Sequence, residues 1–391
     1  MVVGFILSCG STLFCKCKIK LLATQYFLIF CERIKIWNSL EELKTVSYLC
    51  RHMKTLFFPD QISSFHTMLK TERKWVLMSH INPDGDAIGA LRGIGAFLEA
   101  QGREVKMILP NSYPDFLAFL DADGKILIHK SQPEACKMAV QEADAICCLD
   151  MSDISRLEGL SPFVTAASCP KVLIDHHPNP LIEDFDLVFS APALSSSCEL
   201  VYRLICELGM DCPAAAAEPL YTGLMTDTNN FANSVAPESF EVAAALQRLG
   251  VDKERIQQQV FGAFSEGRLR LMAHSVLQRM VVLKAYAAAY IIVSMQDQAQ
   301  YHFEPGDTEG FVNIPLTIKG VNVSVLFVET PWHIRVSLRS RNGVEVHEMA
   351  RTFFNGGGHK QASGGKLYKP ISQVPALFLE ALQQTISPKT L

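Results

Sequence analysis

Residues 79–89 read Ser79-His80-Ile81-Asn82-Pro83-Asp84-Gly85-Asp86-Ala87-Ile88-Gly89. An apolar run at residues 75–78 precedes them and an apolar-periodic segment follows, so the pattern predicts a strand, an acidic loop and a helix. Carboxylates this close together repel one another unless a cation lies between them, and ligands bind at such loops in α/β sheets. We therefore expect a divalent-metal site here. The alternative is an Asx-rich turn beside a chance histidine.

Three later apolar runs also end in acids or histidines. They are residues 146–149 before Asp150, residues 172–174 before Asp175-His176-His177, and residues 221–225 before Thr226-Asp227. A single Asp after a strand is often only a helix N-cap. Four such endings in one domain-sized stretch are hard to explain by capping and favour a shared site.

These four stretches resemble, in the expected order, the motifs of the DHH phosphoesterase superfamily. Residues 356–365, with the sequence GGGHKQASGG, resemble the glycine-rich motif of the DHH-associated domain. Within the superfamily the chain is most similar to the bifunctional oligoribonuclease and pAp phosphatase (nano-RNase) subfamily, over roughly residues 55 to 385. Ala90 departs from the pattern, because many relatives carry Ser there, and we expect little effect on metal binding.

The resemblance and the pattern of apolar and polar residues along the chain together predict two domains. We expect a catalytic α/β domain with a doubly wound, mainly parallel sheet at residues 53–250, because its strands are short and wholly apolar. A helical linker at 251–284 leads to a smaller α+β substrate-binding domain at 285–391, across a cleft. Residues 1–52 fit neither domain. An over-early start codon, a membrane-associating segment and a helical cap compete to explain them, and we favour the first because the domain can begin at Met53.

The expected elements follow from the same apolar patterns. In the first domain the strands are residues 75–78, 105–109, 146–149, 172–174 and 187–189, with helices at 88–100, from Ser197 onward and at 238–249. Residues 252–283 predict an exposed helix pair whose arginines form a solvated face. In the second domain we expect strands at 286–294, 312–318, 321–328 and 334–338, a hairpin turn at Lys319-Gly320, and a short helix at 346–354.

The resemblance implies two metal ions with a shared ligand. One ion is held by His80, Asp84 and Asp150, and the other by Asp86, Asp150, His176 and Asp227. Mixed Asp and His ligands suit Mn²⁺, with Mg²⁺ and Co²⁺ as alternatives. Two ions of this kind suit the hydrolysis of phosphate esters.

The resemblance also implies residues that act on the substrate. His177 would face the phosphate as a catalytic residue beside Asp150 and Asp84, with Asp175 orienting an imidazole; a core histidine is the alternative. The implied substrate-binding residues are His359, Gly357, Gly358, Arg339, Arg341 and Asn82. The two arginines alternate along a strand and can share one face. For the two arginines the alternative is an exposed, charged strand edge. For the glycines it is a tight turn between two elements.

Composition limits the partners. The chain has 391 residues and a formal net charge of −4, which argues against coating of long nucleic acid through phosphate neutralisation. Its 12 cysteines show no zinc-binding spacing. A reducing, cytoplasmic compartment fits these cysteines best. The apolar runs near the N-terminus are shorter than the ~20 residues of a spanning helix, and we expect no membrane partner.

We therefore expect a two-metal, Mn²⁺-dependent phosphoesterase. Its substrates would be short oligoribonucleotides, cut to mononucleotides, and/or pAp, cut to AMP and phosphate. The alternatives are a soluble cyclic-di-AMP or pApA phosphodiesterase, a RecJ-like exonuclease, an inorganic pyrophosphatase and a non-catalytic nucleotide-binding protein. The motifs do not encode the preferred chain length, the polarity of cleavage or the oligomeric state, and a homodimer remains open.

Overall fold

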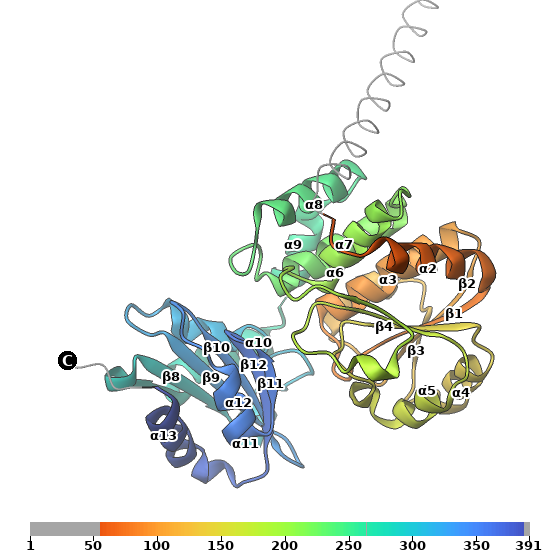
Figure 1. Ribbon diagram of the computed structural model, residues 1–391. Coiled ribbons are helices and arrows are strands. Elements are labelled where there is room, and N and C mark those ends of the chain that lie inside the picture. Colours follow the sequence, from red (N-terminus) through yellow and green to blue (C-terminus); the bar gives the residue numbers. More distant parts are fainter. Residues whose placement is uncertain (1–54, 263, 387–391) are drawn as a thin grey trace, which may run out of the picture. The chain divides into compact units, whose positions relative to one another are not determined.

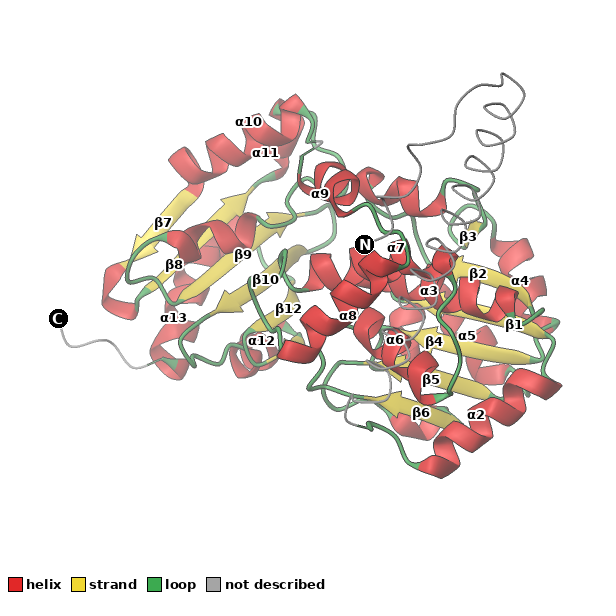
Figure 2. Cartoon of the chain, turned by 90° about the horizontal axis from the view of Figure 1, so that it is seen from above, coloured by secondary structure: helices red, strands yellow, loops and turns green. Residues whose placement is uncertain are grey.

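The computed structural model describes residues 55–262 and 264–386 (Figure 1). The expected N-terminal extension, residues 1–52, lies outside the described residues. Residues 55–391 cluster into one compact unit. Its described part carries two six-stranded sheets, which Figure 2 shows as two separate sets of strands.

The first sheet is wholly parallel, with the order β3-β2-β1-β4-β5-β6. Its strands are β1 (Lys74–Ser79), β2 (Glu104–Leu109), β3 (Ile126–Ile128), β4 (Ala145–Leu149), β5 (Lys171–Asp175) and β6 (Leu187–Ser190). The strand order reverses between β1 and β4. In doubly wound sheets that switch point is where the loops part and ligands bind.

Helices cover both faces of this sheet, as Figure 1 shows. They are α2 (Pro59–Thr71), α3 (Gly85–Ala100), α4 (Pro133–Gln141), α5 (Ser161–Ala166) and α6 (Ser197–Glu207), with short turns η1 (Asp115–Asp121), η2 (Ile154–Leu160) and η3 (Ile182–Asp184). Two further helices, α7 (Ala214–Asp227) and α8 (Pro237–Arg248), pack on this helical layer, with α7 against α3 and α6. Alternate residues of β1 point to opposite faces: Val76 and Met78 join a core with α4 and α5, whereas Leu77 faces Gly95 of α3. Burial on both faces explains why the strands are continuous apolar runs.

The second sheet is mixed, with the order β11-β12-β10-β9-β8-β7. Its strands are β7 (Met280–Leu283), β8 (Ala288–Val293), β9 (Val323–Glu329), β10 (Ile334–Ser340), β11 (Gly357–His359) and β12 (Ala362–Leu367). The accompanying helices and turns are α9 (Lys253–Phe261), α10 (Glu266–His274), η4 (Ser275–Arg279), η5 (Lys284–Tyr286), α11 (Met295–Gln300), η6 (Phe311–Thr317), α12 (His347–Phe354), η7 (Ile371–Gln373) and α13 (Val374–Thr385). Phe327, Phe354 and Phe378 pack edge to face in the core beneath α12 and α13.

The α/β fold class predicted from the sequence is confirmed, but several local predictions are wrong. A 3₁₀ turn at Phe311–Thr317 stands where a strand was expected at 312–318, because Pro315 lies inside it and cannot donate to a ladder. Lys319-Gly320 therefore joins no hairpin. The strands β3, β7, β11 and β12 were not predicted. Ser196, one residue earlier than expected, caps α6 by accepting from Glu199 N.

The linker arginines also differ from the prediction. Arg268 is only 8% exposed, donates to the carbonyls of Gly306 and Glu309, and stacks at 3.9 Å on Phe264. Arg279 pairs with the buried Asp297 at 2.8 Å. Arg268 therefore holds loops of the second domain and is not part of a solvated face. Arg279 remains 41% exposed while it binds α11. Among the described residues, no helix is long and apolar enough to cross a bilayer.

Candidate metal centre and substrate face

Acidic and imidazole side chains meet at the carboxyl ends of the central strands. His80 follows β1, Asp150 follows β4, Asp175 ends β5 and is followed by His176 and His177, and Asp227 ends α7. Asp84 is the N-cap of α3, where its Oδ1 accepts from the backbone N–H groups of Asp86 and Ala87 at 3.1 Å. The parallel fold thus brings together residues that are as much as 147 positions apart in sequence, from His80 to Asp227.

Asp150 lies at the middle of this group. Its Oδ2 is 3.5 Å from Nε2 of His80, and its Oδ1 is 3.6 Å from Nε2 of His176. The Ser197 hydroxyl donates to Oδ1 at 2.9 Å. Asp150 has a left-handed backbone, with φ 55°, an uncommon conformation for a residue with a side chain and one that clusters at functional sites. The two carboxylate oxygens are therefore presented to two different imidazoles.

Each imidazole is oriented through its Nδ1 atom. His80 Nδ1 donates to the Ile81 carbonyl at 2.8 Å, and His176 Nδ1 donates to the Leu194 carbonyl at 3.3 Å. These bonds leave both Nε2 lone pairs facing the carboxylates. Nε2 of His176 lies 3.8 Å from Asp86 and 3.6 Å from Asp227. A backbone carbonyl behind a histidine is the usual support for a metal-ligating imidazole.

The donor set fits two divalent ions. Ligand atoms of His80, Asp84 and Asp150 lie within 4.8 Å of one another, as do those of Asp86, Asp150 and His176. Spacings of 3.5–3.8 Å are too long for hydrogen bonds, but are close to the separation of about 3–3.5 Å expected between neighbouring ligands at ~2.1 Å from a shared ion. The chemistry and the spacing of these donors would suit two divalent ions.

The electrostatics of the carboxylates support the same fit. Burial, with repulsion from Asp150, Asp227 and Asp84, raises the pKa of Asp86 well above its usual value. Burial also raises the pKa of Asp227 to about 6. Burial opposes ionisation of Asp150 too, but His80, His177 and His176 hold its pKa below the usual range. A cluster of carboxylates that repel one another in a buried place is stabilised by bound cations.

Asp175 is paired with the second histidine of the motif. It is fully buried, and its Oδ1 accepts from Nδ1 of His177 at 2.8 Å. Burial lowers the pKa of His177, but this hydrogen bond and the nearby Asp150 raise it more strongly, to about 9. His177 Nδ1 is also 3.6 Å from Asp150. The pair is built to hold His177 as a charged, oriented donor at the edge of the candidate metal centre.

The second sheet brings a third imidazole to the site. The His359 ring centroid lies 5.0 Å from that of His176 and 5.2 Å from that of His177. Its Nε2 is buried and has no hydrogen-bond partner among the described residues. Burial, reinforced by His176 and His177, lowers its pKa to about 4. A neutral imidazole with an unpartnered nitrogen is thus held beside the charged His177.

The glycines before His359 allow this close approach. A Cβ on Gly356 would lie 1.9 Å from the Gly364 carbonyl, and Gly358 has φ +129°. Gly357 has open space where a side chain would stand. Lys360 turns away and pairs with Glu345 at 2.7 Å. Gly356 and Gly358 are therefore required by packing and backbone conformation, whereas the bare edge at Gly357 is available to a ligand.

The two arginines predicted to bind substrate have different surroundings. Arg339, on β10, is half-buried near Asp227 and Asp84, whose attraction opposes the lowering of its pKa by burial. Arg341 lies beyond the strand end, where its Nη2 donates to the Ile318 carbonyl at 3.1 Å. Arg335, which the sequence analysis did not single out, shares the face of Arg339. The even spacing between Arg335 and Arg339 along the strand could have placed Arg335 on this face from the sequence.

Asn82 lies at the rim of the site. Its backbone N–H donates to Asn111 Oδ1 at 2.7 Å, and its side-chain oxygen accepts from Asn111 Nδ2 at 3.2 Å. Asn82 also has a left-handed backbone, with φ 54°. The structure therefore gives it a loop-holding role, while leaving its side chain exposed.

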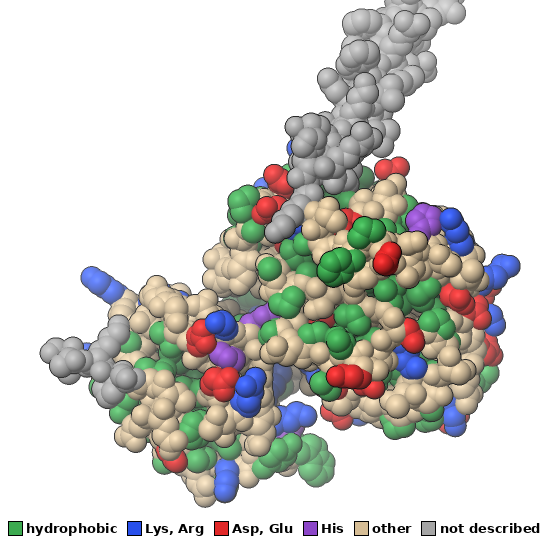
Figure 3. Space-filling model, in the orientation of Figure 1, with side chains coloured by type: hydrophobic (Ala, Val, Ile, Leu, Met, Phe, Trp, Pro, Cys, Tyr) green, Lys and Arg blue, Asp and Glu red, His purple; other side chains and the backbone are tan. Residues whose placement is uncertain are grey.

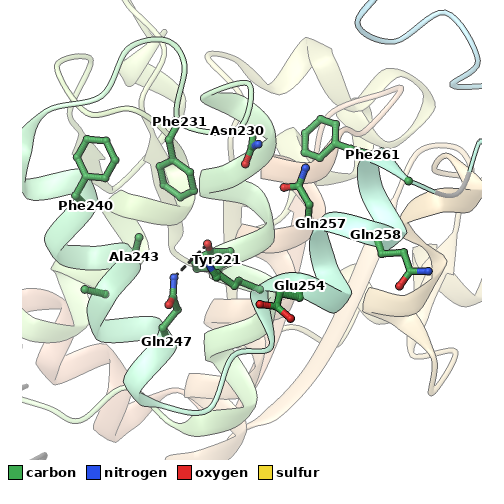
Figure 4. Close-up of a pocket in the computed structure, with 13 residues that line it drawn as sticks. Tyr221, Asn230, Phe231, Phe240, Ala243, Gln247, Glu254, Gln257, Gln258 and Phe261 are labelled. Carbon is green, nitrogen blue, oxygen red and sulfur yellow. Dashed lines mark hydrogen bonds between the residues drawn. The ribbon is translucent and has the colours of Figure 1, made fainter.

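A cavity of about 660 Å³ lies apart from these carboxylates, between α7, α8 and α9 (Figure 4). Phe231 and Phe240 stack in it with ring centroids 5.7 Å apart, and Gln247 donates to the Tyr221 hydroxyl.

On the face shown in Figure 3, lysines and arginines are interspersed with aspartates and glutamates. That face offers no single-sign surface for a long polyanion.

The chain is similar in sequence and in fold to known proteins. Residues 74–224 match the DHH family, N-terminal domain, and residues 284–387 match the DHHA1 domain. A Thermus thermophilus protein named bifunctional oligoribonuclease and PAP phosphatase NrnA is 30% identical over 320 residues, covering 80% of this chain and 90% of its own. Its Bacillus subtilis namesake is 27% identical over 299 residues, covering 75% and 89%. The crystal structure of an exopolyphosphatase-related protein from Bacteroides fragilis is 38% identical, with a TM-score of 0.80, covering 85% of this chain and 98% of that one.

A doubly wound domain with clustered Asp and His ligands, joined to a second sheet that supplies another histidine, defines a metal-dependent phosphoesterase. The chain belongs to the DHH family of these enzymes, with an N-terminal DHH domain and a C-terminal DHHA1 domain.

Proposed function

We propose that the protein hydrolyses short oligoribonucleotides to mononucleotides, and pAp to AMP and phosphate, with two Mn²⁺ ions. The single observation that carries this is the meeting of two sets of metal-ligand atoms at Asp150, beside a face of the second sheet that bears Arg339 and His359. The relatives named as oligoribonucleases and PAP phosphatases support the substrate class. We place the activity in the cytoplasm as part of the same proposal.

Six residues would hold the ions. His80, Asp84 and Asp150 would hold one, and Asp86, Asp150, His176 and Asp227 the other. When bound, such ions lower the pKa of water and neutralise charge on phosphoryl oxygens. Mixed carboxylate and imidazole donors favour Mn²⁺ over Mg²⁺, which prefers all-oxygen surroundings.

The remaining residues would bind and orient the phosphate. His177, held as a cation by Asp175, would donate from its free Nε2 to a phosphoryl or leaving oxygen. His359 would donate or accept at its unpartnered Nε2, on the other side of the same group. Arg339 would contribute a planar guanidinium suited to a terminal phosphate. Positioning and charge complementarity supply most of the catalysis in phosphoryl transfer.

Product analysis tests this proposal. The full chain is incubated with Mn²⁺ and, in parallel, with pAp, a 5′-phosphorylated RNA dinucleotide, cyclic-di-AMP and pyrophosphate, with Asp150→Asn as the blank. We expect AMP from pAp and mononucleotides from the dinucleotide, both lost in the variant. Activity confined to cyclic-di-AMP or to pyrophosphate would keep the metal centre and overturn the substrate.

A polyphosphatase-like activity is the second candidate. The similarity to the Bacteroides fragilis structure, which is described as an exopolyphosphatase-related protein, favours it. A phosphoanhydride would use the same ions and the same histidines. Adding a short polyphosphate to the substrate panel decides between the two, because a polyphosphatase would release phosphate from it at a rate well above that for the dinucleotide.

A further inference from the structure

One face of the second sheet carries two rows of side chains that lead away from the metal centre. On β10, Ile334, Val336 and Leu338 are buried in the core, so the alternate residues Arg335, Ser337 and Arg339 point to the other face. Their partners on β12 are Lys366, Gly364 and Ala362, respectively. Residues paired across a ladder share a face, so these six positions form a two-row strip, here called the β10–β12 strip.

The strip begins at the metal centre. Ala362 pairs with His359, whose ring lies against His176 and His177. Arg339, at the same level, is close enough to Asp84 and Asp227 to be attracted by both. At about 3.3 Å per residue, the five strand steps back along β10 from Arg339 to Ile334 span roughly 17 Å, and Trp332 lies in the turn beyond them. The strip is therefore longer than a single nucleotide needs.

The far end of the strip is aromatic and exposed. Trp332, in the turn before β10, is 84% exposed, and Tyr368 is 64% exposed. The rings of Tyr368 and His333 lie 5.9 Å apart. The Thr330 hydroxyl holds this turn, since it accepts from the N–H groups of Trp332 and His333 and donates to the His333 carbonyl. Trp332 and His333 lie in the turn before β10 and Tyr368 follows β12, so three aromatic side chains stand at the same end of this strand pair.

The middle of the strip is cationic. Arg335 donates one bond to Thr308, while its buried Nε has no hydrogen-bond partner among the described residues. Lys366 is half exposed and has Glu158 only at 3.9 Å. The pKa of His333 is lowered by partial burial and by Lys366 and Arg335, with Glu158 opposing them. The strip thus offers positive side chains between the candidate metal centre and an aromatic end. In a bound single strand, the positive side chains would contact backbone phosphates and the aromatic side chains would contact a base.

We propose that Trp332, with His333 and Tyr368, is a stacking platform for a base near the far end of a short single-stranded oligonucleotide. Arg335 and Lys366 hold the phosphates between that base and the metal centre. This inference rests on the proposed function and deepens it, because it names the element that reads substrate length. Stacking accepts every base, so the platform selects by length and not by sequence. A substrate as short as pAp does not reach it.

The test compares substrates of graded length. Steady-state kinetics with Mn²⁺ are measured on pAp and on 5′-phosphorylated RNAs of two to five nucleotides, for the full chain and for Trp332→Ala, Tyr368→Ala and Trp332→Phe. We expect Trp332→Ala to raise the KM for the longest RNAs about tenfold relative to the KM for pAp, with kcat changed less. Trp332→Phe should restore most of the difference, because it keeps an aromatic face. Leu277→Ala is the matched control, since Leu277 is 77% exposed and lies on η4.

An equal change on all lengths, or no change on any, would overturn the platform. Failure of the proposed function is read separately, by titrating the wild-type protein, with Mn²⁺ present, with a five-nucleotide RNA whose phosphorothioate linkages resist cleavage, and following tryptophan fluorescence, with Trp332→Phe as the reference. Quenching confined to the protein that retains Trp332 supports the platform even if no RNA is cleaved. RNA cleavage by the wild-type protein without such quenching leaves the function standing and removes the platform.

Discussion

Oδ2 of Asp150 lies 3.5 Å from Nε2 of His80, at a place where neither atom has room for bulk water. The other oxygen of the same carboxylate faces His176. A carboxylate that divides its oxygens in this way can bridge two ions. Much of the proposed chemistry therefore depends on one side chain in an uncommon backbone conformation.

Asp150→Asn should abolish activity. An amide can neither bridge two cations nor balance their charge, so we expect a loss of at least about 10³-fold in kcat. Metal content by inductively coupled plasma mass spectrometry should fall in parallel. Asp211→Asn, at an exposed loop residue, is the control and should match the wild type in both measurements. Full activity in Asp150→Asn would remove the two-ion site from the account.

Asp175→Asn tests the orientation of His177. The amide cannot stabilise an imidazolium as the carboxylate does, so we expect kcat to fall about 10- to 100-fold with metal content preserved. Asp175→Glu should recover little, because Asp175 is fully buried and a longer side chain has no space. A loss of metal equal to the loss of activity would show that Asp175 acts on the ions and not through His177.

His359→Gln should separate substrate binding from metal binding. His359 comes from the second sheet, and its ring contacts the imidazoles of His176 and His177 and not a candidate ligand carboxylate of the described residues. We expect both metal ions to remain and kcat/KM to fall about 10²-fold. Lys360→Gln is the neighbouring control, because Lys360 points away toward Glu345. Equal losses in the two variants would argue for a general disturbance of the loop.

Gly223→Ala should damage the centre through packing. A Cβ at Gly223 would lie 2.2 Å from Cys198 Sγ on α6 and 3.0 Å from the Asp86 backbone, so α7 must move away from α6. Overpacking of this kind costs about 1–3 kcal/mol in the free energy of unfolding. Denaturant unfolding measures it, with Gly357→Ala, where a Cβ meets nothing, as the control for stability. An unchanged midpoint for Gly223→Ala would contradict the close approach of the two helices.

Asp297 should make stability depend on pH in the acid range. Burial opposes ionisation, but Arg279, Ser294 and His274 lower its pKa to about 2, below the ordinary 3.8. Because the folded-state pKa is depressed, its stabilisation is present above pH ~4 and is lost as the pH falls from there through about 2. Asp297→Asn should therefore cost about 1–2 kcal/mol at pH 7 and progressively less below pH 4. Glu241→Gln, at an exposed carboxylate on α8, should show no such convergence with the wild type in thermal unfolding at graded pH.

Apolar runs predicted the first sheet well because its strands are buried on both faces. All five strands expected there are present, and each candidate ligand stands at an element end, as the sequence indicated. The three-residue strand β3 is too short to give a periodic signal. Residues 312–318 have a strand's composition, but Pro315 and the packing of Phe311 into the core determine a 3₁₀ turn. Burial of Arg268 under a loop 38 residues away depends on tertiary contacts that no local pattern encodes.

Manganese titration with activity tests the central claim most directly. Protein freed of metal by chelation is titrated with Mn²⁺, and bound ions per chain are measured beside the rate of hydrolysis of a 5′-phosphorylated RNA dinucleotide. We expect two ions per chain, with the rate of hydrolysis rising steeply as the second site fills. Asp150→Asn should show no hydrolysis. Full activity with one ion per chain, or activity that persists without any, would contradict it.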